Sequence, residues 1–200
     1  MDLSKVAKVA LKNVRSGEVL AMEEVWKERT TVFIFFRRWG CLFCRLWARE
    51  LSEIAPLLRD NSVSMVGVGV DEVGLQEFVD GKFFDGELYV DVNKQVYSAM
   101  QFKRFNILSV LASLFSSEAR AATAKARAMK LGGDLRGDGL QNGGVLVVSA
   151  GGKEVLYRFR QEGPAEHPPN LALLRAVGLE ALAPPPAQST PAPPQCPGDA

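Results

Sequence analysis

Two cysteines separated by two residues, Cys41 and Cys44, are the side chains in this sequence best suited to chemistry. At this spacing one thiolate can attack a substrate and the other can resolve the product as a disulfide. Three arginines, Arg37, Arg38 and Arg45, flank the pair and favour the thiolate form. The pattern therefore predicts a redox-active dithiol.

The residues around the cysteines predict the elements that position them. Residues 31–36, TVFIFF, form a continuous β-branched and aromatic run, which is typical of a strand buried on both faces. Residues 42–58 carry apolar side chains at three- and four-residue spacings, which predicts an amphipathic helix. The cysteines then lie at the N-terminus of that helix, where the partial positive charge lowers the pKa of a thiol.

Two other roles for the cysteine pair are weaker. A zinc site needs two further ligands, but the third cysteine, Cys196, lies near the C-terminus and the single histidine, His167, stands alone. Simple packing in the core fits poorly with a preceding loop that is polar and rich in arginine. We therefore expect no metal and a redox role for Cys41 and Cys44.

Alternating apolar runs and amphipathic stretches over residues 1–180 predict one α/β domain. The order predicts parallel strands first and an antiparallel hairpin, turning at Gly151 and Gly152, last. That arrangement is a central mixed sheet with helices on both faces. Beyond the two elements at the cysteines, we expect strands at residues 63–70, 88–90, 144–150 and 153–159 and helices at 73–79, 93–100 (capped by Asn93), 119–130 and 171–177.

Two segments break this rhythm. Residues 101–143, before the last hairpin, are long for a connection and hold an apolar stretch, a basic alanine-rich helix and a mobile glycine-rich loop. This helical insertion is expected to be a lid packed on the domain, or a surface that touches a membrane or an amphiphilic substrate. Residues 181–200 hold seven of the eleven prolines, so we expect a disordered tail that includes Cys196.

Charge and composition exclude several classes of protein. The 24 basic and 23 acidic residues leave a net charge of +1, so no overall charge draws the chain to nucleic acid or anionic membranes. A hydrophobic content of 47% argues against a mostly disordered chain. No apolar run has the length of a signal peptide or a membrane span. We expect a cytosolic protein with reduced thiols.

The CLFC motif, which opens a helix directly after a strand, resembles the thioredoxin fold. The longer segments RRWGCLFCRLWARELSEI and FVDGKFFDGELYVDVNKQVY resemble the peroxiredoxin-like family of thioredoxin-fold proteins, and the likeness extends over residues 1–180. It implies a thiol-dependent oxidoreductase that reduces prostaglandin-type endoperoxides, prostaglandin H2 and prostamide H2, to the F2α products. It also implies no tightly bound cofactor, with NADPH or thioredoxin as the electron donor.

The resemblance leaves two alternative functions open. A general thiol peroxidase or redox regulator would use the same dithiol, whereas a thioredoxin-like adaptor would be non-catalytic. A binding site for NADPH is not visible, because Gly67-Val68-Gly69 lacks the third glycine and the turn of a dinucleotide fingerprint.

The family patterns assign opposite roles to the two sulfurs. Thioredoxins attack with the first cysteine of the motif. In the peroxiredoxin spacing, counted back from Cys44, Cys44 attacks and Cys41 resolves, with Cys41 and Arg37 in the places of the family's threonine and proline. We favour Cys44 on this count.

Four residues next to the pair are candidates for substrate binding. Arg37 and Arg38 are suited to hold a carboxylate or a developing alkoxide. Trp39 and Phe43 are suited to line an apolar pocket for a lipid, although Phe43 also has the spacing of a core residue.

Overall fold

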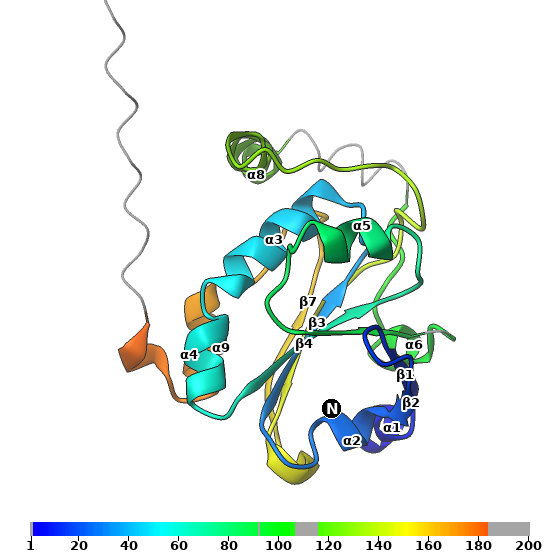
Figure 1. Ribbon diagram of the computed structural model, residues 1–200, viewed down its shortest axis with the longest axis vertical. Helices are drawn as coiled ribbons and strands as arrows, with labels where there is room; N and C mark the ends of the chain where they lie inside the picture. The colour runs from blue at the N-terminus through cyan, green and yellow to red at the C-terminus, as the bar shows by residue number, and fades with distance from the viewer. Residues whose placement is uncertain (1, 92, 107–115, 184–200) are drawn as a thin grey trace, which may run out of the picture.

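The computed structural model describes residues 2–91, 93–106 and 116–183, which form one mixed sheet between two layers of helices (Figure 1). Within these residues seven strands run in the order β2-β1-β5-β4-β3-β6-β7. The strands are β1 Ala10–Asn13, β2 Val19–Ala21, β3 Thr31–Phe36, β4 Ser64–Gly69, β5 Glu87–Val90, β6 Gly144–Val148 and β7 Val155–Arg160. The helices are α1 Ser4–Ala7, α2 Met22–Val25, α3 Leu42–Ser52, α4 Ala55–Asp60, α5 Leu75–Asp80, α6 Gln95–Ala99, α8 Ser117–Ala128 and α9 Asn170–Ala176, with 3-10 turns at Ala150–Gly152 and Glu180–Leu182.

Strand β3 occupies the interior of the sheet, between β4 and β6. It pairs parallel with β4 and antiparallel with β6, and β4 pairs parallel with β5. The hairpin β6–β7 turns through Gly151 and Gly152, whose φ angles of 71° and 68° favour glycine. The expected mixed sheet, with parallel strands followed by an antiparallel hairpin, is confirmed.

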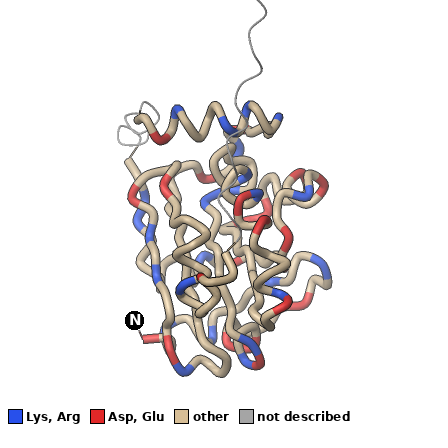
Figure 2. The backbone as a smooth tube through the Cα atoms, turned by 90° about the vertical axis from the view of Figure 1, so that its left-hand side faces the viewer, with Lys and Arg blue, Asp and Glu red and all other residues tan. Residues whose placement is uncertain are grey.

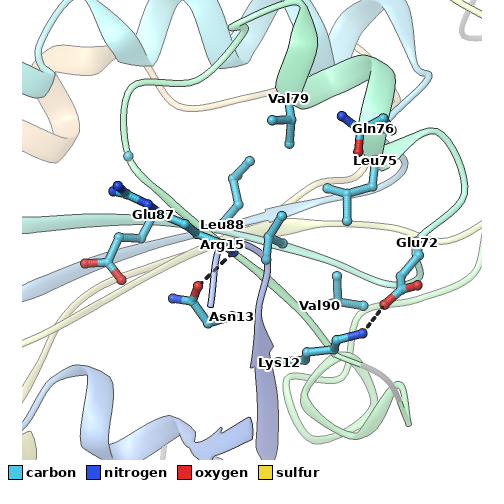
Figure 3. A pocket seen from close by; sticks show the side chains of 12 residues that line it. Lys12, Asn13, Arg15, Glu72, Leu75, Gln76, Val79, Glu87, Leu88 and Val90 are labelled. Carbon is cyan, nitrogen blue, oxygen red and sulfur yellow. Dashed lines mark hydrogen bonds and ion pairs between the residues drawn. The ribbon is translucent and has the colours of Figure 1, made fainter. Parts of the chain in front are cut away.

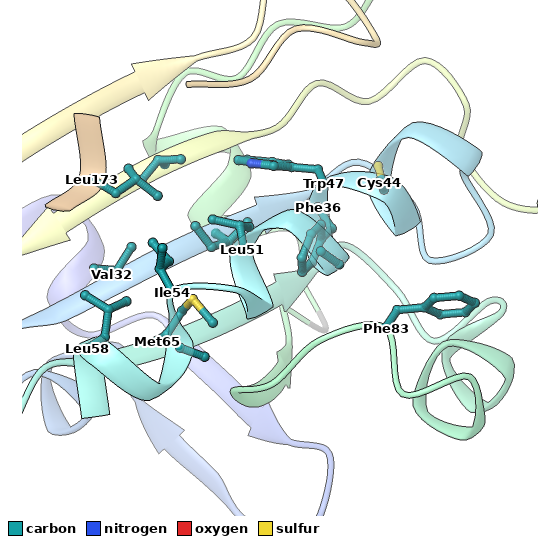
Figure 4. Packing of buried hydrophobic residues seen from close by; sticks show 14 of the residues in the cluster. Val32, Phe36, Cys44, Trp47, Leu51, Ile54, Leu58, Met65, Phe83 and Leu173 are labelled. Atoms are coloured by element: carbon teal, nitrogen blue, oxygen red, sulfur yellow. The ribbon is translucent and has the colours of Figure 1, made fainter. Parts of the chain in front are cut away.

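Alternate residues of β3 face two separate cores. Val32, Ile34 and Phe36 pack with side chains of α3, α4, α5 and α9 on one face of the sheet. Figure 4 shows this core around Val32 and Phe36. Phe33 and Phe35 belong to the second core, with side chains of α1, α2 and α6. Because successive side chains of a strand point to opposite faces, a fully apolar β3 is covered by helices on both sides.

Two helices differ from the sequence expectation. The helix expected over residues 42–58 is two helices, α3 and α4, and the second carries Pro56 in its first turn, where the missing N–H does no harm. Helix α6 is not capped by Asn93. Instead, the buried carboxylate of Asp91 accepts hydrogen bonds from the first backbone N–H groups of the helix, including that of Val96 at 2.8 Å.

The hairpin β1–β2 was not expected from the sequence. Its two strands are short, and Leu11 is the buried residue of β1, so the pattern carries little periodicity. The strands are instead stabilised by pairing in the sheet, where β1 runs antiparallel to both β2 and β5.

The insertion is described in part. Residues 107–115, with most of the expected apolar stretch, lie outside the described residues. The expected basic helix is α8, which begins after Ser116, whose Oγ accepts a hydrogen bond from the Ala119 N–H at 3.1 Å. Residues 129–143, here called the return loop, lead from α8 back to β6.

Helix α8 lies beside α3 at one end of the sheet (Figure 1). Of the tail expected from Ala181, residues 184–200, with Cys196, lie outside the described residues, whereas Ala181 and Leu182 belong to a 3-10 turn and continue the folded domain. In the described part of the chain, no helix combines the length and apolar composition needed to cross a bilayer.

Candidate active site

The junction of β3 and α3 places the two cysteines at one helix end. Strand β3 ends at Phe36, a four-residue loop follows, and Cys41 is the N-cap of α3 in extended conformation. Cys44 lies in the first turn of the helix and faces the core near Phe36 and Trp47 (Figure 4). Both thiols are free and buried, with 5% of Cys41 and 2% of Cys44 exposed.

Hydrogen bonding divides the pair into a thiolate and a proton donor. A hydrogen bond from the Cys44 side chain is the main effect that lowers the pKa of Cys41 to about 5, and the charges of Arg37 and Arg38 act in the same direction. The same hydrogen bond, together with burial, raises the pKa of Cys44 well above its usual value. The electrostatics thus favour Cys41 as the nucleophile, opposite to the assignment from the peroxiredoxin spacing.

Arg37 is a buried cation whose hydrogen bonds are engaged within the protein. Its Nη1 lies 3.8 Å from the sulfur of Cys41 and 3.5 Å from the carbonyl oxygen of Pro164. Its Nη2 donates to the carbonyl of Gly139 at 2.6 Å, and its Nε to that of Gln141 at 3.1 Å. With these donors engaged, Arg37 is placed to stabilise a thiolate. Its expected role in holding a carboxylate or a developing alkoxide stays a prediction.

Arg45 fixes the return loop from the other side. Its Nε donates to the carbonyl of Trp39 at 3.1 Å, and its Nη1 to that of Gly132 at 2.9 Å. The backbone N–H of Asp134 donates to the carbonyl of Gly40 at 2.8 Å. The glycine-rich segment, expected to be a mobile loop, is therefore hydrogen-bonded to the loop that precedes Cys41.

Glu50 on α3 anchors α8 to the domain. Its Oε1 accepts a hydrogen bond from Lys125 on α8 at 2.6 Å, and its Oε2 lies 3.4 Å from Nε2 of His167. The His167 ring stacks on Trp47 with centroids 5.5 Å apart, so this histidine is part of the packing and not an isolated residue. These contacts fit the expectation of a helical lid.

A cavity of about 590 Å³ lies between α8, the return loop and the N-terminus of α3. Cys41 is part of its wall, whereas Cys44 is not among the residues that line it. Arg37, Arg38 and Phe43, three of the four predicted binding candidates, also line it. Cavities of this size hold small organic ligands. A molecule bound here would meet the sulfur of Cys41 and not that of Cys44.

The fourth candidate, Trp39, is a core residue. Its Nε1 donates to the carbonyl of Asp71 at 2.6 Å, and its ring packs on Phe36 and Phe78 with centroids 5.7 and 4.9 Å away. A Cβ atom at Gly69 would overlap the indole, so β4 has a glycine where the ring crosses it. The loop turns Trp39 inward, so it does not join the other three candidates in the cavity wall. Its expected role in a lipid pocket stays a prediction.

The larger cavity of the domain is not the site of this chemistry. It has a volume of about 670 Å³ and lies between β1, α5 and β5. Figure 3 shows its apolar wall, with Leu75, Val79 and Leu88, and the ion pair of Lys12 and Glu72, 2.9 Å apart, at its edge. Its lining contains neither cysteine.

The part of the lining contributed by α8 and the return loop was not predicted from the sequence. Thr123 and Arg127 come from the helix, and Leu131, Leu135 and Leu140 come from the loop. The mixture of basic and apolar residues in the insertion had suggested contact with a membrane or an amphiphilic substrate. It did not indicate which of its residues turn towards the cysteines.

Comparison with known proteins finds a family model and curated relatives that match this sequence. The family model described as AhpC/TSA antioxidant enzyme matches residues 50–163, which begin after the two cysteines. Curated relatives named prostamide/prostaglandin F synthase match a longer stretch. The relatives from Homo sapiens and Bos taurus are each 43% identical over 181 residues, or 90% of this chain. The match covers 91% of the human protein and 90% of the bovine one. That of Xenopus tropicalis is 40% identical over 181 residues, 90% of each chain.

Solved structures share the fold at low sequence identity. A PrxQ mutant of Xylella fastidiosa aligns with a TM-score of 0.59 at 11% identity, over 91% of this chain and 93% of its own. Peroxidoxin BcpB from Mycobacterium tuberculosis aligns with a TM-score of 0.58 at 15% identity, over 89% and 94%. At these identities the likeness shows the fold alone, which is the thioredoxin-like fold of peroxiredoxins.

Proposed function

Because the chain belongs to the AhpC/TSA antioxidant enzyme family and is a thiol-dependent oxidoreductase, we propose that it reduces prostaglandin H2 and prostamide H2 to their F2α products. The names of its relatives support this substrate class. The observation that carries the proposal is the state of Cys41, a thiol of lowered pKa in the wall of a cavity, with the protonated Cys44 behind it.

The first step is attack by the Cys41 thiolate on one oxygen of the endoperoxide. A sulfur–oxygen bond forms as the oxygen–oxygen bond breaks, and the released oxygen takes a proton from water to become the first hydroxyl. Arg37 stays next to the sulfur, 3.8 Å away, and stabilises the negative charge before the attack.

The second step closes the disulfide. Cys44 gives up its proton and attacks the sulfur of Cys41, the sulfur–oxygen bond breaks, and the second oxygen leaves as a hydroxyl that carries this proton. The dithiol has lost two electrons and the endoperoxide has gained them. The raised pKa of Cys44 keeps its proton available until this step.

An external dithiol then restores the enzyme. We propose that thioredoxin, supplied with electrons from NADPH, reopens the disulfide by thiol exchange in the cytosol. The pair Gly67 and Gly69 supports this choice over bound NADPH, because both glycines lie inside β4 against aromatic rings and do not form a phosphate-binding turn.

Turnover of prostaglandin H2 by the reduced protein tests the proposal. With dithiothreitol as reductant and mass spectrometry as readout, we expect the F2α product above the level of a heat-inactivated blank. Cys41→Ser and Cys44→Ser should each abolish this turnover, and Cys196→Ser serves as the matched control that retains it. Absence of F2α product in the wild type would reject the proposal.

A general thiol peroxidase is the second candidate, and the family description as antioxidant enzyme favours it. The two functions differ in their preferred oxidant. We expect hydrogen peroxide to be consumed far more slowly than prostaglandin H2, because the largely apolar cavity favours a lipid. Equal rates with both would identify a general peroxidase.

A further inference from the structure

The cavity at Cys41 contains one acidic side chain, and that charge is neutralised by the protein itself. The carboxylate of Asp134 lies 3.7 Å from Nη2 of Arg45 and 3.4 Å from Nη2 of Arg136. These arginines and the backbone N–H of Arg136 hold the pKa of Asp134 below its usual value against its burial. The negative charge of Asp134 is therefore already paired with arginines of the protein and is not available to a cation in the cavity.

The cavity wall also contains three arginines, and one of them already uses its hydrogen-bond donors within the protein. Arg37 donates to backbone carbonyls and lies against the thiolate-forming sulfur. Arg38 uses Nη1 to donate to the carbonyl of Arg136 at 3.0 Å, but it pairs with no carboxylate among the described residues. Its positive charge is uncompensated there.

Arg127 is the third arginine and lies in the last turn of α8 with an exposed side chain. Within the described ranges its side chain makes no ion pair or hydrogen bond. Its neighbour Lys125, in the same turn, is instead paired with Glu50 at 2.6 Å outside the cavity. Figure 2 shows α8 crossing the top of the molecule with basic residues along it. Two cations, Arg38 and Arg127, thus line the cavity with no acidic partner in the part of the chain that the structure describes.

The remaining wall of the cavity is largely apolar. Leu42 and Phe43 come from α3, and Leu131, Leu135 and Leu140 come from the return loop. Leu135 is 92% exposed, so it presents apolar surface to anything that enters. An apolar wall with two uncompensated cations matches an amphiphile that has a hydrocarbon chain and one anionic group.

Resting on the proposed function for the reaction at Cys41, we propose that Arg127 and Arg38 bind the carboxylate of a lipid substrate whose hydrocarbon chain lies along the leucine wall. Guanidinium–carboxylate hydrogen bonds are among the stronger polar contacts in proteins because both partners are charged. A lipid ethanolamide has no charge at that end. The two arginines therefore act on the free acid and contribute little to the ethanolamide.

The helix dipole offers another reason for Arg127, because a cation in the last turn of a helix interacts favourably with its C-terminal carbonyls. The two roles predict different results when the charge is removed. Loss of a dipole contact weakens α8 and affects every ligand of the cavity alike. Loss of a carboxylate site affects anionic ligands alone.

Binding of arachidonate and of its ethanolamide to the full-length reduced protein separates these roles. Both probes have the chain but no peroxide, so their binding does not depend on the reaction. We expect Arg127→Gln to weaken arachidonate binding by about five- to tenfold, and Arg38→Gln to act in the same direction. Binding of the ethanolamide should change by less than about twofold. Lys130→Gln, which removes a charge outside the cavity, is the matched control and should leave both probes unaffected.

An equal loss of affinity for both probes in Arg127→Gln would assign the residue to the stability of α8 and overturn the proposal. Unchanged arachidonate binding would overturn it as well. The proposed function can fail separately: if arachidonate binds with the expected dependence on Arg127 while prostaglandin H2 is not turned over, the carboxylate site stands and the endoperoxide reaction is rejected.

Discussion

A guanidinium nitrogen of Arg37 lies 3.8 Å from the sulfur of Cys41, and both side chains are buried. A buried cation favours the thiolate because water screens the pair poorly. Backbone carbonyls, two of them from the return loop, satisfy the guanidinium, so the charge is tolerated in the interior. The reactivity of the cysteine is therefore coupled to a segment about a hundred residues away in the chain.

Replacing Arg37 with methionine should make Cys41 less reactive at acidic pH. Because the pKa of Cys41 is lowered, the thiolate persists as the pH falls towards 5, and loss of the cation raises this pKa. A rise of one pKa unit from about 5 would slow alkylation by iodoacetamide about twofold at pH 6 and by nearly tenfold at about pH 4. The measurement is the rate of Cys41 labelling against pH. Arg37→Lys, which keeps the charge, should lie between the two, and an unchanged profile would contradict the role of Arg37.

Replacing Cys44 with alanine should raise the pKa of Cys41 further than Arg37→Met does. The hydrogen bond from Cys44 is the largest effect on this pKa, and alanine removes the donor. Cys44→Ser retains a hydroxyl donor and is the matched control, with a labelling profile closer to that of the wild type. The same pH series of labelling rates measures both variants.

Brief alkylation of the wild-type dithiol should modify Cys41 before Cys44. Cys41 lines the cavity and has the lowered pKa, whereas Cys44 is 2% exposed and its pKa is raised. Peptide mapping by mass spectrometry after short exposure to iodoacetamide at pH 7 gives the order. Label that accumulates first on Cys44 would restore the assignment from the peroxiredoxin spacing.

Replacing Gly69 with alanine should destabilise the domain by about 1–3 kcal/mol, because the new Cβ overlaps the buried indole of Trp39. Urea unfolding followed by circular dichroism measures the change. Gly163→Ala, where the added Cβ meets only the Cβ of Glu166 at an ordinary contact distance of 3.9 Å, is the matched control and should be nearly neutral. If Trp39→Leu in the same chain does not recover part of the loss from Gly69→Ala, the overlap is not its cause.

Local patterns were enough to place the dithiol. The apolar run of residues 31–36 and the helical periodicity after Cys41 depend on neighbours in the chain, so the strand, the helix and the cysteines at its start follow from the sequence. The choice of attacking sulfur did not follow. It depends on which thiol donates the hydrogen bond and on the approach of Arg37, and spacing contains neither.

Contacts between distant segments determine what the sequence alone did not show. Trp39 is adjacent to the motif, yet its place is set by Gly69 and Asp71, which the chain reaches thirty residues later. Arg127 was visible as one basic residue among several in the insertion. Its position in the cavity wall depends on how α8 packs against α3 through Glu50, which no pattern in the helix itself indicates.

The cover formed by α8 and the return loop restricts the two halves of the catalytic cycle unequally. A hydrocarbon chain has a small cross-section, whereas a folded reductant has to bring its own sulfur to within bonding distance of the disulfide. Because both cysteines are buried, that approach requires two hydrogen bonds to break, the one from Arg45 to Gly132 and the one from Asp134 to Gly40. We expect regeneration by a protein reductant to require this displacement of the return loop, and a small dithiol to reduce the disulfide faster than a bulky one.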